Sequence, residues 1–250
     1  MSEVKEKFRD LIEEQNLNIF DGPFVVKNFL KNVEDYLNWN TLNDAINSVG
    51  IEWQLLGENQ KSLDIPCNWP YWAELRKQNK QFIIEHVNKG SPFVVDRCCI
   101  LNDNLKSLVS DIQEAFPVAC DIHIYGSKGT NSKSFTPHAD RYNIFIIQAI
   151  GDTDWIVYKN RISEILPFPA YRKDNDKPSE VLTPTLEVTL SPGDLLYIPP
   201  RAYHVALPSM PRLSMSIPCI SLDYFDLIQH LPNFDQVVNR LPPDVNKYEF

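Results

Sequence analysis

The spacing of apolar residues changes along the chain, from helical intervals in the first half to strand-like runs in the second. Near the N-terminus, apolar residues recur every three or four positions, at Val4, Phe8, Leu11 and Ile12, which predicts a helix with one packed face. Further helices are predicted within 33–49, 69–90 and 102–116, the last two ending at Gly90 and Pro117. Strands are predicted within 22–30 and 91–100.

From residue 118 onward, short β-prone runs are separated by glycine, proline, asparagine and aspartate. The runs are DIHIY, YNIFIIQAI, DWIVYK, LEVTL, DLLYIP and RLSMSIP. Many short strands with such turns predict a sandwich or a barrel. We therefore expect an α+β chain with a helix-rich part at 1–115, a β-rich core at 116–220 and a short helical tail at 221–250.

Two segments of the strand-rich half carry potential metal ligands. PHADRYNIFIIQ at 137–148 places His138 and Asp140 two residues apart, and SPGDLLYIPPRAYH at 191–204 ends on His204. Side chains at i and i+2 of a strand share a face, and a later antiparallel strand can bring the third ligand beside them. Two imidazoles and one carboxylate leave open positions on a metal, which suits Fe(II) in oxygen-activating enzymes. A histidine and an aspartate two residues apart, such as His138 and Asp140, also occur by chance in many proteins. The second segment, which ends on His204, makes a metal site the better interpretation.

Composition narrows the classes of protein that the chain can belong to. Its 250 residues are 43% hydrophobic with only 8 glycines, which allows a large core and argues against disorder. A formal net charge of −9 disfavours general binding to nucleic acid or to an anionic membrane. No stretch approaches the roughly 18 apolar residues that span a bilayer, and no apolar signal core is present. Five cysteines without a CxxC spacing disfavour a disulfide framework, so we expect a cytoplasmic protein with mostly buried thiols.

The two segments that carry the potential ligands also resemble a known family. PHADRYNIFIIQAIGDTDW and LSPGDLLYIPPRAYHVALP are similar to the PHxD…FxxQ…G…W and GDxLYIPPxxxH runs of JmjC-type, cupin-like oxygenases, particularly the ribosomal oxygenase branch. The resemblance covers roughly residues 20–220. It implies a double-stranded β-helix, or jelly roll, flanked by N-terminal helices. It also implies oxidation that depends on Fe(II), 2-oxoglutarate and dioxygen, usually hydroxylation of a protein side chain.

Carried over to this sequence, the resemblance assigns roles to single residues. It makes His138, Asp140 and His204 the iron ligands, which leaves room for the chelating 2-oxoacid and for dioxygen. Tyr125 and Thr136 lie near positions where the family's polar residues bind the far carboxylate of 2-oxoglutarate, to which a hydroxyl can donate.

One position departs from the family. Relatives hold that carboxylate with a lysine or arginine at the position of Thr153, which cannot form an ion pair. Arg212, at the start of the last predicted strand, is a possible replacement, since other 2-oxoglutarate oxygenases use an Arg-x-Ser there. Alternatively Arg212 is a surface strand residue. Lys159 and Arg97 are the other basic candidates.

Several further residues have two possible interpretations. His123 is a cosubstrate contact or a structural histidine, and the stretch 171–180 is a solvated loop or a lid. Trp155 is expected to pack outside the barrel under a helix. A group of aromatic residues forms part of the core or lines a substrate cleft: Trp53, Trp69, Tyr71 and Trp72.

The favoured function is an Fe(II)- and 2-oxoglutarate-dependent oxygenase acting on a protein or a small molecule. The alternatives are a cupin-like metal-binding module without 2-oxoglutarate turnover and a cupin that uses dioxygen without 2-oxoglutarate. Thr153 favours the binding module, whereas the intact triad and Arg212 favour the enzyme. We expect the last 30 residues to be too few for the winged-helix domain that ends typical ribosomal oxygenases, so a ribosomal protein is not carried over as the substrate. The substrate and the oligomeric state stay open.

Overall fold

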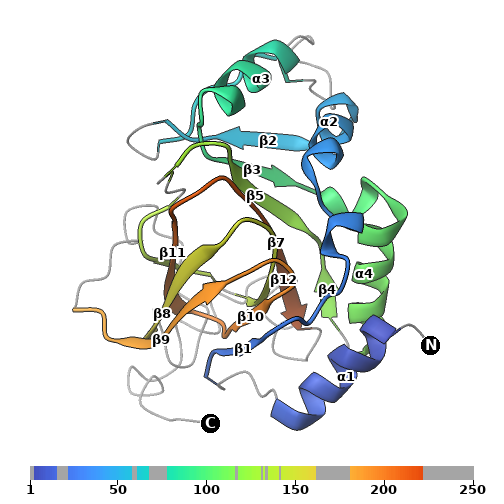
Figure 1. Cartoon of the computed structure of the whole chain (residues 1–250), viewed down its shortest axis with the longest axis vertical. Coiled ribbons are helices and arrows are strands. Elements are labelled where there is room, and N and C mark those ends of the chain that lie inside the picture. Colours follow the sequence, from blue (N-terminus) through green and yellow to red (C-terminus); the bar gives the residue numbers. More distant parts are fainter. Residues whose placement is uncertain are drawn as a thin grey trace, which may run out of the picture.

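The computed structural model describes residues 3–15, 22–57, 61–67, 78–115, 118–130, 132, 135–140, 142–161 and 181–221. Its β-rich part consists of two antiparallel sheets with helices outside the larger one (Figure 1). Within the described part of the chain, no helix combines the length and the apolarity that crossing a membrane would require. This arrangement matches the jelly roll with N-terminal helices that the sequence predicts.

The larger sheet draws its strands from the whole length of the chain. Its order is β1 (Phe24–Val26), β10 (Leu195–Ile198), β7 (Asn143–Ile150), β12 (Arg212–Ser221), β5 (His123–Ser127), β3 (Phe93–Asp96) and β2 (Glu52–Leu55). A further strand, β4 (Val118–Cys120), also pairs with β12. The smaller sheet has the order β6 (His138–Ala139), β11 (Ala202–Pro208), β8 (Thr153–Arg161) and β9 (Pro184–Leu190).

Helices cover the outer face of the larger sheet. Two long helices, α1 (Glu3–Gln15) and α4 (Asp103–Ala115), lie together along one side of the molecule (Figure 1). The ring of Phe8 in α1 meets the ring of Phe145 in β7 edge-on, with centroids 5.4 Å apart. Two shorter helices, α2 (Trp39–Asn47) and α3 (Lys80–Asn88), lie at the β2 end of the sheet (Figure 1). The single-turn helix η1 (Val33–Asp35) contacts β7, and η2 (Cys98–Ile100) contacts α4.

The central strands of the larger sheet are buried on both faces. In β7, Phe145 and Ile147 belong to the core under the helices, whereas Ile144 and Ile146 point between the two sheets. The same alternation holds in β10, where Leu195 faces the helices and Leu196 faces the smaller sheet. Successive side chains of a strand point to opposite faces, so one strand contributes to two separate cores. The second core lies between the two sheets.

Most of the predicted elements are confirmed. The helix predicted within 69–90 begins at Lys80, because the side chain of Asn79 caps it by accepting a hydrogen bond from the backbone N–H of Phe82 (3.0 Å). Strand β2 was not predicted, although its four residues alternate between polar and apolar side chains, with Trp53 and Leu55 buried. The loop at 171–180, the aromatic residues at 69–72 and, beyond Ser221, the C-terminal tail lie outside the described residues.

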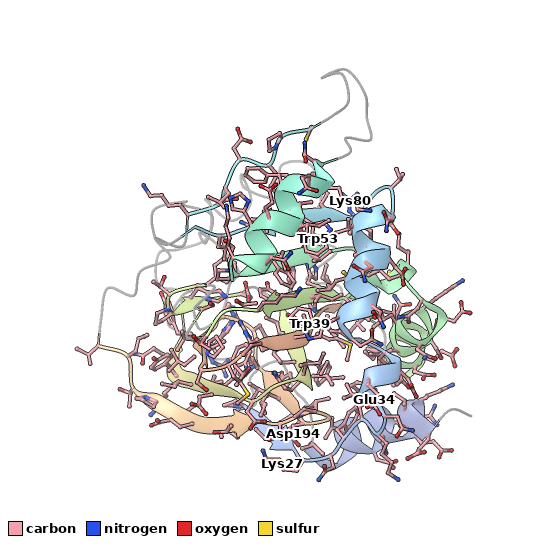
Figure 2. The ribbon with its side chains drawn as sticks, turned by 45° about the horizontal axis from the view of Figure 1, so that its top comes forward. Lys27, Glu34, Trp39, Trp53, Lys80 and Asp194 are labelled. Atoms are coloured by element: carbon pink, nitrogen blue, oxygen red, sulfur yellow. The ribbon has the colours of Figure 1, made fainter. Side chains whose placement is uncertain are left out.

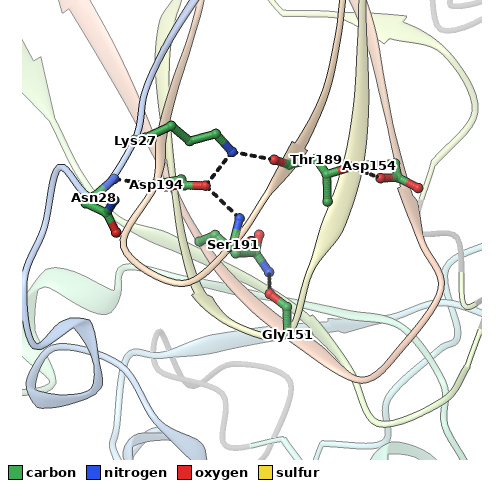
Figure 3. Close-up of polar contacts among 8 residues, drawn as sticks. Lys27, Asn28, Gly151, Asp154, Thr189, Ser191 and Asp194 are labelled. Atoms are coloured by element: carbon green, nitrogen blue, oxygen red, sulfur yellow. Dashed lines mark hydrogen bonds and ion pairs between the residues drawn. The ribbon is translucent and has the colours of Figure 1, made fainter.

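A buried carboxylate ties the first strand to the turn between β9 and β10. Asp194 accepts hydrogen bonds from the backbone N–H groups of Asn28 (3.0 Å) and Ser191 (2.8 Å), and its other partner is the Lys27 ammonium at 2.8 Å (Figure 3). Lys27 also donates to the carbonyl of Thr189 (2.7 Å). Burial acts to raise the pKa of Asp194, but these donors outweigh it and lower that pKa. Figure 2 shows Lys27 and Asp194 together at the end of the molecule opposite α3.

Replacing Asp194 by asparagine should lower the free energy of unfolding at pH 7 by about 1–3 kcal/mol, because buried donors lose a charged acceptor. Since the folded pKa of Asp194 is lowered, its carboxylate stabilises the fold above about pH 4, and this contribution is lost as the pH falls through the lowered pKa. Urea unfolding from about pH 6 down to about pH 3 should therefore show a smaller pH effect in Asp194→Asn than in the wild type. Glu187→Gln, at an exposed carboxylate on β9, is the control and should match the wild type.

Candidate metal centre and adjoining cavity

Three predicted ligands meet where β6 pairs with β11. His138 in β6 lies directly opposite His204 in β11, and their ring centroids are 4.5 Å apart. Asp140 follows β6, and its Oδ2 atom lies 3.7 Å from Nε2 of His138 and 3.4 Å from Nε2 of His204. One possible ligand atom from each residue lies within 4.8 Å of the others, and no other described cluster of three histidines, cysteines or acids is as compact. The prediction that these three side chains converge is confirmed.

Backbone carbonyls orient both imidazoles. The Nδ1–H of His138 donates to the carbonyl of Thr136, and the Nδ1–H of His204 donates to the carbonyl of Ala202, each at 3.0 Å. A carbonyl only accepts, so Nδ1 carries a proton in each ring, and Nε2 is the nitrogen that faces Asp140 and could bind a metal. Ring nitrogens held in this way are typical of metal-ligating histidines.

Asp140 is placed by its backbone and by its neighbours. The backbone N–H of Arg201 donates to the carbonyl of Asp140 (2.6 Å), which ties the loop after β6 to the turn before β11. Burial acts to raise the pKa of Asp140, but the hydrogen bond to His204 and the nearby charges of His204, His138 and His123 outweigh it and lower that pKa. The carboxylate is therefore ionised at neutral pH, as a metal ligand has to be.

A cavity opens beside these ligands, between the two sheets. Its volume is about 450 Å³, counting the open mouth. Both sheets contribute to its wall, together with the segment before β6. The lining residues are Tyr125, Phe135, His138, Asp140, Ile144, Ile146, Trp155, His204, Ala206, Arg212, Ser214 and Ser216.

Arg212 brings a buried positive charge to this cavity. It begins β12 and is only 1% exposed, so the alternative of a surface strand residue is wrong, whereas its role as a partner of the far carboxylate stays a prediction. Burial lowers the pKa of Arg212 to about 10, while the nearby Tyr125 acts in the opposite direction. The guanidinium remains protonated at neutral pH, and a cation in a cavity wall favours an anionic occupant.

Hydrogen bonds connect Arg212 to the glutamine of the FxxQ run. The guanidinium lies 3.5 Å from the hydroxyl of Ser214, which itself donates to Oε1 of Gln148 (2.8 Å). The amide group of Gln148 then donates to the carbonyls of Ile150 and Gly151, both at 2.9 Å. Gln148 is fully buried, so these hydrogen bonds satisfy a polar group inside the core and fix Ser214 in place.

Two polar residues of the cavity wall were not singled out from the sequence, Ser214 and Ser216. In β12 the residues Arg212, Ser214 and Ser216 line the cavity, whereas Leu213, Met215 and Ile217 belong to the core under the helices. The alternation of RLSMSI carries this information, because polar residues at every second position share one face. That signal could have identified both serines once the face of Arg212 was known.

The other predicted cosubstrate residues differ in their position. Tyr125 lines the cavity, and burial together with the charge of Asp140 raises the pKa of its phenol, so it is a hydrogen-bond donor. Thr136 is exposed, and it contacts His138 through its carbonyl. Thr153 is buried at the start of β8, opposite Leu190 and Pro208. Neither threonine is among the residues that line the cavity.

The alternative cations and His123 also lie outside the cavity wall. Lys159 is exposed on β8, and Arg97, with 58% of its side chain exposed, lies 3.6 Å from Glu52. His123 contacts the carboxylate of Asp96 at 2.5 Å. Burial acts to lower the pKa of His123, but the hydrogen bond to Asp96 and the nearby acids raise it overall. Its contacts favour the structural interpretation.

The expectation for Trp155 is wrong. The side chain does not pack outside the barrel but lies between the sheets, where it lines the cavity with its ring centroid 6.3 Å from that of His204. Because β8 is covered on its inner face by the larger sheet, every second residue from Thr153 to Val157 is buried. Trp53 belongs to the core, packed against Phe93 at 5.3 Å between ring centroids.

Comparison with known proteins identifies relatives for the strand-rich half. A family model described as JmjC domain matches residues 101–227. The bifunctional lysine-specific demethylase and histidyl-hydroxylase NO66 of Dictyostelium discoideum is 35% identical over 107 residues, or 42% of this chain and 20% of that protein. Human ribosomal oxygenase 1 is 33% identical over 96 residues, or 38% of this chain and 14% of that protein. The matches therefore span about a fifth or less of these relatives.

Solved structures extend the similarity to most of the chain. The structure of Escherichia coli YcfD has a TM-score of 0.60 at 18% identity and covers 92% of this chain and 57% of that one. YcfD in complex with cobalt and 2-oxoglutarate has a TM-score of 0.57 at 21% identity and covers 88% of this chain and 53% of that one. At such identities the likeness shows the fold, a double-stranded β-helix with flanking helices.

The match to the family model includes all three clustered ligands and Arg212. It takes in every strand from β4 to β12 and just over half of the 250 residues. This chain belongs to the JmjC domain family.

Proposed function

We propose that this chain is an Fe(II)- and 2-oxoglutarate-dependent oxygenase that hydroxylates a protein side chain or a small molecule. The observation that carries this proposal is one cavity with a metal-binding triad and a buried arginine in its wall. It is supported by the relative named a histidyl-hydroxylase and by the similar fold of YcfD, which is described in complex with 2-oxoglutarate.

The triad has the donor chemistry that Fe(II) requires. Two imidazole nitrogens and one carboxylate oxygen lie within 4.8 Å of one another, and both imidazoles are fixed by carbonyls. The three residues would bind the metal from one side, which leaves positions for other ligands. The metal, 2-oxoglutarate and dioxygen together would supply the oxidising chemistry of this class.

The residues of the cavity would bind and orient 2-oxoglutarate. Arg212 would pair with the far carboxylate, and the hydroxyl of Tyr125 would donate to one of its oxygens. Ser214, whose hydroxyl donates to Gln148, would help to hold the Arg212 guanidinium in place. Ile146 and Trp155 would exclude water, which strengthens the ion pair. In this proposal the charge comes from β12, because Thr153 on β8 carries none.

The cellular setting is part of the same proposal. All five cysteines are free thiols, which supports a reducing compartment such as the cytoplasm. The net charge of −9 favours a substrate that presents a basic or neutral surface, without general nucleic-acid or membrane binding. The main alternative is a metal-binding module without turnover, which the neutral residue at 153 favours.

His138→Ala and His204→Ala should each abolish stoichiometric Fe(II) binding, because two remaining ligands hold the ion weakly. Metal analysis after anaerobic loading and desalting checks this. His86→Ala is the matched control, since that imidazole contacts a carbonyl in α3, away from the cavity, and iron binding should stay at the wild-type level. Full iron retention in both ligand variants would overturn the metal centre.

Arg212→Ala should weaken binding of 2-oxoglutarate by at least about 30-fold, since leaving a buried carboxylate unpaired costs about 2–5 kcal/mol. Anaerobic titration of the iron-loaded protein measures this, and iron content together with the melting temperature checks that the variant folds. Arg212→Lys, which keeps the charge, should lose less affinity. Arg97→Ala is the exposed control. An unchanged affinity in Arg212→Ala would overturn its role as the partner of the far carboxylate.

The iron-loaded wild type should convert 2-oxoglutarate to succinate slowly by itself and faster when cell extract supplies the substrate. Succinate release is the measurement, and Asp140→Ala gives the background because it lacks the carboxylate ligand. An enzyme of this class also consumes dioxygen in step with succinate. Binding of 2-oxoglutarate with no succinate above the Asp140→Ala background would favour the binding module instead.

A further inference from the structure

Two cysteines face each other across the pairing of β4 with β12. Cys120, the last residue of β4, is the direct partner of Cys219 in the antiparallel register. Side chains at such positions share one face, with Cβ atoms about 4.5–5.5 Å apart. A disulfide needs Cβ atoms about 3.5–4.5 Å apart, so a small closing movement of the two strands would suffice.

The two thiols lie close together, although each has a weak backbone acceptor of its own. The thiol of Cys219 lies 3.6 Å from the carbonyl of Ile217, and that of Cys120 lies 3.9 Å from the carbonyl of Val109. The interaction between the two cysteines lowers the pKa of Cys120 and raises that of Cys219. Cys120 is half-buried, whereas Cys219 is fully buried. The thiolate that reacts with a small oxidant is therefore favoured at Cys120, whose sulfur is the more accessible of the two. Cys219, the direct partner of Cys120 in the strand register, supplies the second sulfur.

The remaining cysteines of this region differ from Cys120. Burial raises the pKa of Cys98, which is fully buried and donates to the carbonyl of Val95 (3.1 Å). Burial and a hydrogen bond to Asp121 raise the pKa of Cys99 to about 11. Both sulfurs stay protonated at neutral pH and react slowly. The exposed Cys67 lies elsewhere, in the segment that bridges to Gln78.

We propose that Cys120 and Cys219 are a redox modification site, at which a peroxide oxidises the two thiols to a reversible disulfide between them. The Cys120 thiolate attacks one peroxide oxygen, so that an S–O bond forms, the O–O bond breaks and hydroxide leaves. The Cys219 sulfur then attacks the Cys120 sulfur, the S–O bond breaks, and the released oxygen takes up the protons as water. Two electrons pass from the two sulfurs to one hydrogen peroxide, which becomes two waters.

The disulfide would link β4 to the strand that forms one wall of the cavity. Cys219 lies in β12 together with Arg212, Ser214 and Ser216, but its own side chain points to the core under the helices. Formation of the bond requires neither metal nor 2-oxoglutarate. The disulfide can therefore be tested independently of the proposed oxygenase function.

The test treats the folded, metal-free Cys67→Ser protein with hydrogen peroxide at pH 7, so that the exposed thiol does not react. Mass spectrometry should show the loss of two hydrogen atoms, and digestion without reductant should give one cross-linked peptide pair containing Cys120 and Cys219. Dithiothreitol should reverse both changes. Additional replacement of Cys120 or Cys219 by serine should abolish the cross-link, whereas Cys99→Ser, the matched control, should keep it.

A second measurement avoids variants of the buried cysteine. Alkylation of native Cys67→Ser protein by iodoacetamide should modify Cys120 at least about tenfold faster than Cys99, and peroxide treatment should block Cys120. Oxidation of Cys120 to sulfinic acid without a cross-link, or a disulfide between Cys99 and Cys120, would overturn the proposal. A cross-link that forms only in urea would also overturn it.

Discussion

The candidate metal centre depends on a ladder of only two residue pairs. Strand β6 meets β11 through His138 with His204 and Ala139 with Tyr203, and a slip by one position would turn one imidazole to the opposite face. So short a ladder does not hold its own register. The longer pairing of β11 with β8 positions one side, and the bond from the Arg201 N–H to the Asp140 carbonyl fixes the other. The ligands are therefore placed by their neighbours more than by their own strands.

The sequence predicts the metal ligands better than it predicts the rest of the site. His138 and Asp140 share a face through simple alternation, and the motif that ends on His204 identifies the third ligand from the order of residues alone. Arg212 becomes a candidate through its resemblance to the Arg-x-Ser that other 2-oxoglutarate oxygenases use on the last strand. Its burial does not follow from the sequence, because an arginine at a strand end is equally typical of a surface residue.

The interior positions are harder to predict, since strands such as β7 are apolar on both faces. IFIIQAI contains no alternation to tell which residues face the helices and which face the cavity, and the same holds for Trp155 in β8. In β12 polar and apolar residues do alternate, but the sequence does not tell whether the polar face lines a cavity or faces solvent. Hydrophobicity predicts that a residue is buried, whereas the partner that buries it is decided by the tertiary fold.

The ion pair between Lys27 and Asp194 joins residues that are 167 positions apart in the sequence. Strand β1 pairs only with β10 among the described strands, so during synthesis it leaves the ribosome long before its partner exists. Closing so long a loop is entropically costly, and chains dominated by such pairings fold slowly. The order of strands in the larger sheet thus predicts late docking of the N-terminal strand. A nascent chain would expose its apolar FVV segment until nearly all of the jelly roll has formed.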